Sequence, residues 1–166
     1  MKVVKKQTNS KMCIICGMEN QAGVNAPFYE MEDESVMTIF KFKNEHQSYP
    51  GRTHGGMIST LLDELVGRAI WIYDPTIWGV TMDINVKFRK PVPLETTLIA
   101  KGKITKNTSM FFSGEGWIYD EYGKVLAEAK VNYIKLPISK IAENAKHEDI
   151  DILIPDDVKE ISFKER

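Results

Sequence analysis

The stretch YPGRTHGGMISTLLDELVGRAI, residues 49–70, decides how the rest of the chain must fold. It opens with Pro50-Gly51, a strong turn signal. Its apolar residues then recur at helical spacing, which predicts a helix from about Gly55 to Tyr73. Asp74-Pro75 ends that helix, because the residue before a proline disfavours the helical conformation. No other segment of the sequence predicts a helix of this length.

The predicted helix has a polar face opposite its apolar one. Seven residues make almost two turns, so Gly56 and Asp63 share this face. Glycines at 55 and 56 let a ligand approach the unpaired first-turn N–H groups, which can stabilise an oxyanion. Seven residues also rise about 10 Å, so Gly56 and Asp63 can flank one reacting carbon only if a two-fold-related helix supplies one of them.

A simpler interpretation of this face needs no ligand. Gly-Gly would only permit close packing, and Asp63 would lie on a solvated surface. Against it, Asp63 stands among leucine and valine residues on the same two turns. Glu64 has Arg68 four residues further on, which predicts a surface ion pair.

Strand patterns surround the helix. Residues 28–42 have strand character, broken by acidic residues at 30–34, and residues 80–88 alternate apolar with polar side chains. Three more strands are predicted at 97–105, 110–119 and 124–136. This order predicts an α+β fold in which an antiparallel sheet of about five strands wraps one long helix. Because one helix covers too little of such a sheet, we expect the chain to dimerise through the sheet.

The composition is that of an ordinary globular domain, with 43% hydrophobic residues, 27% charged residues and a net charge of −1. No basic bias favours nucleic acid as a partner, and no apolar run is long enough for a membrane span. The basic but polar N-terminus and the low cysteine content favour a cytoplasmic protein. Residues 1–11 are expected to be flexible, and residues 139–166 to form a C-terminal extension with a short helix or tail.

Cys13 and Cys16 have the spacing of half a zinc site. Structural zinc normally takes four ligands from one chain, and the sequence holds no second cysteine pair. No thioredoxin-like pattern surrounds the two cysteines either. We therefore predict neither a metal site nor a redox pair.

The motif within residues 49–64 resembles the signature of the phenylacetic-acid-degradation (PaaI-type) acyl-CoA thioesterases. Its core is His54-Gly55-Gly56 followed by Asp63, nine residues after the histidine. The segment from Gly79 through Thr81 to Pro91 is similar to the strand that follows the helix in this family. The resemblance covers residues 13–136, including Cys13 to Gly17 and Asn20. It implies a hotdog fold over residues 12–138, acting as a homodimer or as a dimer of dimers.

The resemblance also implies roles for the motif residues. Asp63 would be the general base or the nucleophile in hydrolysis of an acyl-CoA thioester. Gly55 and Gly56 would form the oxyanion site, with the Gly56 N–H as the preferred donor. Thr81 would position the attacking water, and His54 would orient the thioester or only shape the turn. Some relatives carry an asparagine where Ser48 stands, and Gln47 or His46 could replace it.

A basic cluster near the motif could hold the phosphates of coenzyme A. Its members are Arg52, Lys87, Arg89 and Lys90. The reaction would need no cofactor, because coenzyme A is part of the substrate. Two other functions stay open: an acyl-thioester dehydratase or hydratase, for which His54 is poorly placed, and a non-catalytic acyl-CoA-binding module, which need not keep Asp63.

Overall fold

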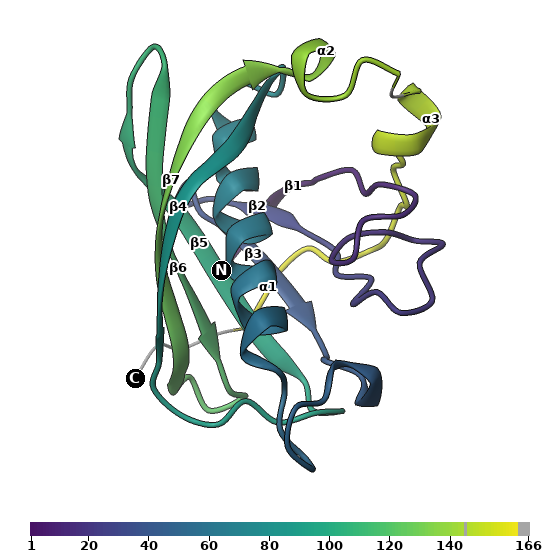
Figure 1. The fold of residues 1–166 in the computed structure, drawn as a ribbon, viewed down its shortest axis with the longest axis vertical. Coiled ribbons are helices and arrows are strands. Elements are labelled where there is room, and N and C mark those ends of the chain that lie inside the picture. Colours follow the sequence, from purple (N-terminus) through teal and green to yellow (C-terminus); the bar gives the residue numbers. More distant parts are fainter. Residues whose placement is uncertain (145, 163–166) are drawn as a thin grey trace.

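The computed structural model describes residues 1–144 and 146–162 as one long helix against one curved antiparallel sheet (Figure 1). The sheet has seven strands in the order β1-β2-β3-β5-β6-β7-β4. The strands are β1 (Val3–Lys6), β2 (Tyr29–Met31), β3 (Val36–Phe40), β4 (Ile77–Phe88), β5 (Leu98–Asn107), β6 (Phe111–Tyr119) and β7 (Val125–Pro137). The helices are α1 (Gly55–Arg68), α2 (Ile138–Ile141) and α3 (His147–Ile150), with 3-10 turns η1 (Asn44–His46) and η2 (Ala69–Ile72).

Helix α1 is the central element, as its apolar spacing predicted. Leu61, Leu62, Leu65 and Val66 have no exposed surface. The strands facing the helix carry glycines at 102, 114 and 116, and a Cβ at any of them would come within 2.9 Å of Leu65 or Val66. These glycines let the helix lie directly on β5 and β6. The predicted α+β arrangement of one long helix wrapped by an antiparallel sheet is confirmed.

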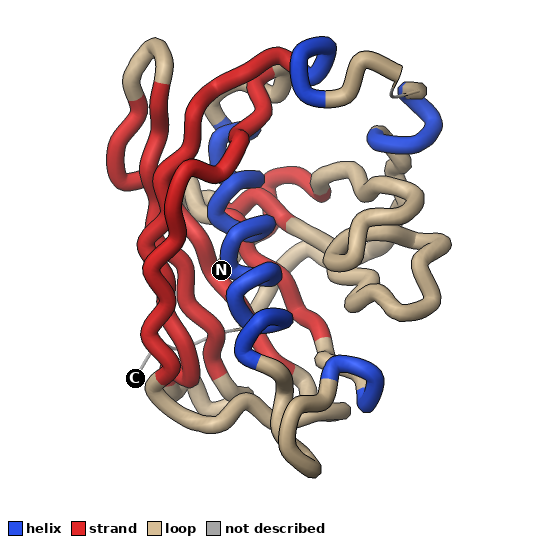
Figure 2. The backbone as a smooth tube through the Cα atoms, viewed as in Figure 1, coloured by secondary structure: helices blue, strands red, loops and turns tan. Residues whose placement is uncertain are grey.

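The sheet differs from the prediction in size and in the place of β4. Seven strands are present rather than about five, because β1 joins the sheet and the 28–42 region divides into β2 and β3. Strand β4 follows the helix in sequence but pairs with β7, the last strand (Figure 2). It therefore ends the sheet, and among the described strands none pairs with its outer edge.

A β-bulge interrupts β4 at Met82. Thr81 pairs with Tyr133 while Asp83 pairs with the adjacent Asn132, so Met82 is an extra residue in the ladder. Val80 and Met82, predicted on the buried face, are 37% and 59% exposed. Ile84 and Val86 beyond the bulge pack against the core as predicted. Because of the extra residue, the residues before Met82 have their side chains on the opposite face of the sheet from that expected by simple alternation. Thr81 therefore points toward α1.

Residues near the two ends of the described chain lie together. Residues 1–11, predicted to be flexible, instead form β1, which pairs with β2, and bury Gln7 and Asn9. The C-terminal extension returns to this edge: Val3 N–H donates to the Lys159 carbonyl at 2.9 Å. The prediction for residues 1–11 was wrong because polar side chains conceal backbone pairing with distant residues. Among the described helices none is long and apolar enough to cross a membrane.

Candidate active site

Asp63 lies on the third turn of α1, half-buried, and faces β4. Its carboxylate Oδ1 accepts a hydrogen bond of 2.8 Å from the Thr81 hydroxyl. Burial raises the pKa of the Asp63 carboxyl above its ordinary value, the Thr81 hydrogen bond opposes this rise, and the neighbouring Glu64 charge adds to it. A carboxyl in this setting is a candidate proton acceptor. The structure thus brings together two of the predicted site residues, Asp63 and Thr81.

Tyr133 on β7 supports Asp63 from the sheet and was missed by the sequence analysis. Its hydroxyl donates to the Asp63 backbone carbonyl at 2.7 Å, and its ring stacks on Phe112 at 4.5 Å between centroids. A Cβ at Gly79 would lie 2.5 Å from Phe112, so glycine there makes room for the stacked rings. The only sequence signal was the place of Tyr133 on the buried face of a predicted strand, which indicates burial but no contact.

At the start of α1, the N–H group predicted as the oxyanion donor is not free. His54 is the N-cap residue, and its Nδ1 accepts from the Gly56 N–H at 2.9 Å. The preferred oxyanion donor is therefore already paired. The Gly55 N–H has no acceptor within the described residues, so it is a free first-turn donor.

The predicted substrate-binding residues only partly come together. Ser48, Arg52, Arg89 and Lys90 line one groove of about 440 Å³ at the start of α1, which Gly55 also lines. Arg89 is at the same time paired with Glu128 at 2.7 Å, and Lys87 reaches the same carboxylate at 3.8 Å.

Lys87, Gln47 and His46 are not among the residues that line this groove. The Gln47 side chain accepts a hydrogen bond from Gly51 within its own loop. His46 is buried, with Nδ1 bonded to the Lys43 N–H and Nε2 to the Ala22 carbonyl. His46 therefore cannot replace the missing asparagine.

Asp63 opens into a second hollow, away from the groove. A cleft of about 110 Å³ is bounded by Asp63, Thr81, Tyr133 and the two rings Trp71 and Trp78. Trp71 and Trp78 also line a larger cavity of about 420 Å³, so the two spaces adjoin. The Asp63 cleft and the Gly55 groove have no lining residue in common. Asp63 and Gly55 thus lie in separate hollows of one chain.

Glu64 and Arg68 form an ion pair of 2.8 Å, but the prediction of a surface pair was wrong. The Arg68 side chain is only 6% exposed. Its guanidinium donates to the Thr8 carbonyl and stacks against Phe28 and Trp71. The burial arises because the N-terminal segment, expected to be flexible, covers this part of the helix.

Comparison with known proteins gives concordant matches. The sequence profile of the thioesterase superfamily matches residues 50–127. Acyl-coenzyme A thioesterase THEM4 of Mus musculus is 27% identical over 117 residues, 69% of this chain and 49% of the relative. The chain thus spans about half the length of that relative.

Solved structures share the fold. A hypothetical thioesterase with coenzyme A from Streptococcus pneumoniae TIGR4 superposes with a TM-score of 0.61 at 23% identity, over 68% of this chain and 87% of that chain. A putative phenylacetic acid degradation-related thioesterase from Ralstonia eutropha JMP134 gives 0.60 at 16% identity, over 67% and 85%. Residues 50–127 are thus similar to the thioesterase superfamily, and the chain shares the hotdog fold of these solved structures.

Proposed function

We propose that the protein hydrolyses acyl-coenzyme A thioesters, with Asp63 as the general base. The observation that carries the proposal is the half-buried Asp63 carboxylate, held by Thr81 and open to a cleft. The match of residues 50–127 to the thioesterase superfamily and the names of the relatives support the same reaction.

In this mechanism Asp63 takes a proton from water as the water oxygen attacks the thioester carbonyl carbon. The Thr81 hydrogen bond keeps Oδ1 in place, so Oδ2 is the acceptor. The carbonyl oxygen becomes an oxyanion and is stabilised by the free Gly55 N–H at the positive end of α1. The tetrahedral intermediate then breaks its C–S bond, and the leaving thiolate recovers the proton from Asp63. No cofactor is required.

The active site is proposed to form across a dimer. Gly55 and Asp63 are eight residues apart on one helix, a rise of about 12 Å, and they open into different hollows. A second chain can close this gap if its α1 runs antiparallel to the first. The open edge of β4, directly beside Thr81, is suited to pairing with its own copy and would place the two helices in that relation.

The two hollows suggest where the coenzyme A part and the acyl part of the substrate bind. The phosphates of coenzyme A fit the groove with Arg52, Arg89 and Lys90, because cations there face an otherwise apolar space. The acyl group would run from Asp63 along the contacting rings of Trp71 and Trp78, 4.8 Å apart between centroids, toward the larger cavity. That cavity also contains Lys5 and Glu30, so we expect acyl groups with a polar or aromatic end to be accepted.

A panel of acyl-CoA substrates tests the proposal, with release of coenzyme A followed by a thiol reagent. Saturable hydrolysis by the purified protein is expected, together with its loss in Asp63→Asn. Hydration or dehydration of the acyl chain without thiol release would instead identify a dehydratase. Saturable binding without turnover would identify a non-catalytic module. A single turnover in ¹⁸O-labelled water should label only the released acid, whereas label in Asp63 would show a nucleophilic carboxylate.

A further inference from the structure

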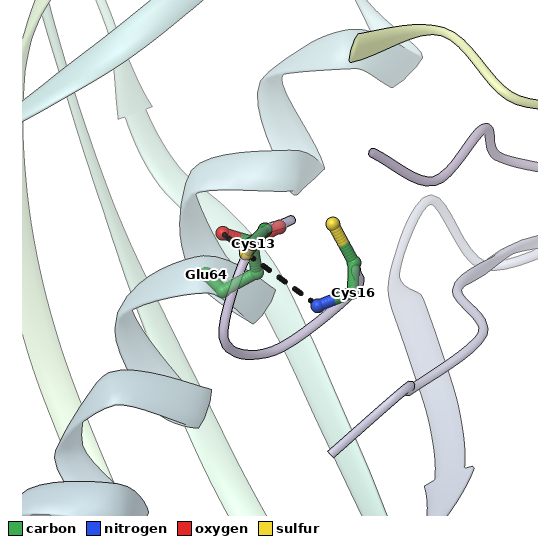
Figure 3. A group of neighbouring side chains, drawn as sticks. All are labelled: Cys13, Cys16 and Glu64. Atoms are coloured by element: carbon green, nitrogen blue, oxygen red, sulfur yellow. Dashed lines mark hydrogen bonds between the residues drawn. The ribbon is translucent and has the colours of Figure 1, made fainter. Parts of the chain in front are cut away.

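Cys13, Cys16 and Glu64 form a cluster that the proposed hydrolysis does not use (Figure 3). Their two sulfur atoms and one carboxylate oxygen all lie within 4.8 Å of one another. The cysteines belong to the N-terminal loop, and Glu64 belongs to α1. The sequence alone predicted no metal site, because the cysteine pair offers only two ligands. Folding supplies a third ligand from a distant element.

The loop around Cys13 is shaped to present sulfur. The N–H groups of Ile15 and Cys16 both point at the Cys13 Sγ, at 3.3 and 3.5 Å. The turn closes with a 2.8 Å bond from the Gly17 N–H to the Cys13 carbonyl. Residue 17 must be glycine, because a Cβ there would lie 2.3 Å from that carbonyl oxygen. Such N–H groups favour a negatively charged sulfur and fix its direction.

Charge at the cluster favours a bound cation. The Glu64 Oε1 is paired with the buried Arg68, while its Oε2 faces the Cys13 Sγ at 3.8 Å. Two thiolates and Glu64 would carry three negative charges. A divalent ion together with Arg68 balances them.

The separations agree with a tetrahedral thiolate site. With Zn–S of about 2.3 Å and Zn–O of about 2.0 Å, neighbouring ligands are roughly 3.5–3.8 Å apart. The Cys13 Sγ to Glu64 Oε2 separation of 3.8 Å is about 0.3 Å longer than the sulfur–oxygen value of about 3.5 Å. All three ligand atoms lie within 4.8 Å of one another, so side-chain shifts of about 1 Å or less complete the set. The fourth position is open to water or to the Ser10 hydroxyl, which contacts the Cys16 Sγ at 3.3 Å. Cys13 is partly exposed, so an ion and a water molecule can reach it.

We propose that Cys13, Cys16 and Glu64 bind one zinc-class divalent ion, with water or Ser10 as the fourth ligand. The ion ties the N-terminal loop to helix α1 next to Asp63. Thiolate ligands select zinc over magnesium or calcium, which prefer oxygen. Both cysteines bind as thiolates, so metal binding releases protons and affinity should rise with pH.

The test uses the full chain, purified under reducing conditions without a chelator. Its metal content is measured by mass spectrometry, and the chelator-stripped protein is then titrated with Co²⁺. We expect about one zinc ion per chain, and thiolate-to-cobalt charge-transfer absorption that disappears when Zn²⁺ is added. Cys13→Ser and Cys16→Ser should each weaken Zn²⁺ binding at least about 100-fold. Loss of a residue that only hydrogen-bonds to a metal ligand usually weakens binding about 10- to 100-fold, so a larger loss indicates a direct ligand.

Glu64→Gln provides a variant that keeps an acceptor for Arg68 and removes only the charge. It should weaken binding at least about tenfold, while Glu19→Gln, on the same loop but outside the cluster, should leave binding unchanged. Circular dichroism confirms that each variant is folded. Folded, reduced wild-type protein that gives no cobalt charge transfer, or a Cys13–Cys16 disulfide in protein isolated from cells, would overturn the proposal. No hydrolysis is measured, so this outcome is independent of the thioesterase proposal.

Discussion

The Thr81 hydroxyl donates a 2.8 Å hydrogen bond from strand β4 to the Asp63 carboxylate on helix α1. This contact depends on the bulge at Met82, which brings Thr81 to the helix side while Ile84 and Val86 still reach the core. Together with the hydrogen bond from Tyr133, it restrains the rise in the pKa of Asp63 caused by burial. The strand therefore sets both the position of the carboxylate and the pH at which it ionises.

Thr81→Val should move the acid limb of the kcat/KM profile to higher pH. Removing the hydroxyl leaves only the Tyr133 hydrogen bond to oppose burial, so the pKa of Asp63 rises further and the ionised base appears at higher pH. Above that limb, activity should stay within about tenfold of wild type, because the base itself remains. Thr81→Ser keeps the donor and should keep the profile. An unshifted acid limb in Thr81→Val would show that this hydrogen bond does not control the base.

Asp63→Asn should lower kcat by about 100- to 10,000-fold, the usual contribution of a general base. Steady-state hydrolysis of the best acyl-CoA substrate measures the effect. Asp83→Asn is the matched control, because Asp83 is an exposed carboxylate two residues beyond Thr81 that is bonded to Asn132. Equal loss in both variants would point to damage of β4 rather than to loss of a base.

The same Asp63→Asn substitution should stabilise the fold at neutral pH. A raised pKa means that the folded chain holds the Asp63 proton more tightly than the unfolded chain does. The linked stability is complete below the unfolded pKa and is lost as pH rises through the folded pKa. Urea unfolding should therefore show wild type less stable than the variant at pH 7, with the difference shrinking as pH falls. A difference that grows toward acid pH would mean that Asp63 is stabilised as an anion.

Gly55→Pro should abolish most hydrolysis, by about 100- to 1,000-fold in kcat, because it removes the proposed oxyanion donor. Proline suits the first helical position, and His54 already has an extended conformation with ψ of 134°, as the residue before a proline requires.

Gly55→Ala controls for the Cβ, which would approach Phe88 at 3.3 Å in either variant. It retains the N–H and should keep much more activity than the proline variant. Similar loss in both variants would indicate crowding at Phe88, with no part for the Gly55 N–H.

Two inactive variants should restore activity when mixed, if the site spans two chains. In a heterodimer of Asp63→Asn with Gly55→Pro, one site carries both changes and the other carries none. Random exchange makes about half of the dimers hetero, so about a quarter of wild-type activity should return. Mass labelling confirms that subunits exchange. Exchange without recovery would place the whole site within one chain.

Local pattern was enough to predict the elements that carry the site, but not how they meet. The spacing of Leu61, Leu62 and Leu65 predicted α1, because burial of a helix face leaves a periodic trace in sequence. Residues 80–88 were predicted as a strand, yet neither the bulge at Met82 nor the pairing with β7 has a local signal. A bulge leaves the alternation of apolar and polar residues unchanged in the sequence, so it can be recognised only when the partner strand is known.

The candidate site shows the same limit. The spacing from His54 to Asp63 indicated the carboxylate, whereas Tyr133, 70 residues further along the chain, could not be connected to it. The Gly56 N–H was preferred as donor because no sequence pattern shows which way the His54 ring turns. The pairing of Glu64 with Arg68 was predicted, but the contact of Glu64 with Cys13 was not, since it depends on an irregular loop 51 residues earlier in the chain.

The first and the last described residues lie close together in the fold. The Met1 amino group donates to the Ile161 carbonyl at 2.8 Å, so a short linker could join residue 162 to residue 1. New termini could then open at the exposed Glu121-Tyr122 turn between β6 and β7, remote in sequence from Asp63, Thr81 and Gly55. In such a circular permutant β1 would lie in the middle of the sequence. It would be flanked by its two pairing partners, β2 and the segment around Lys159, and neither would be at a chain end.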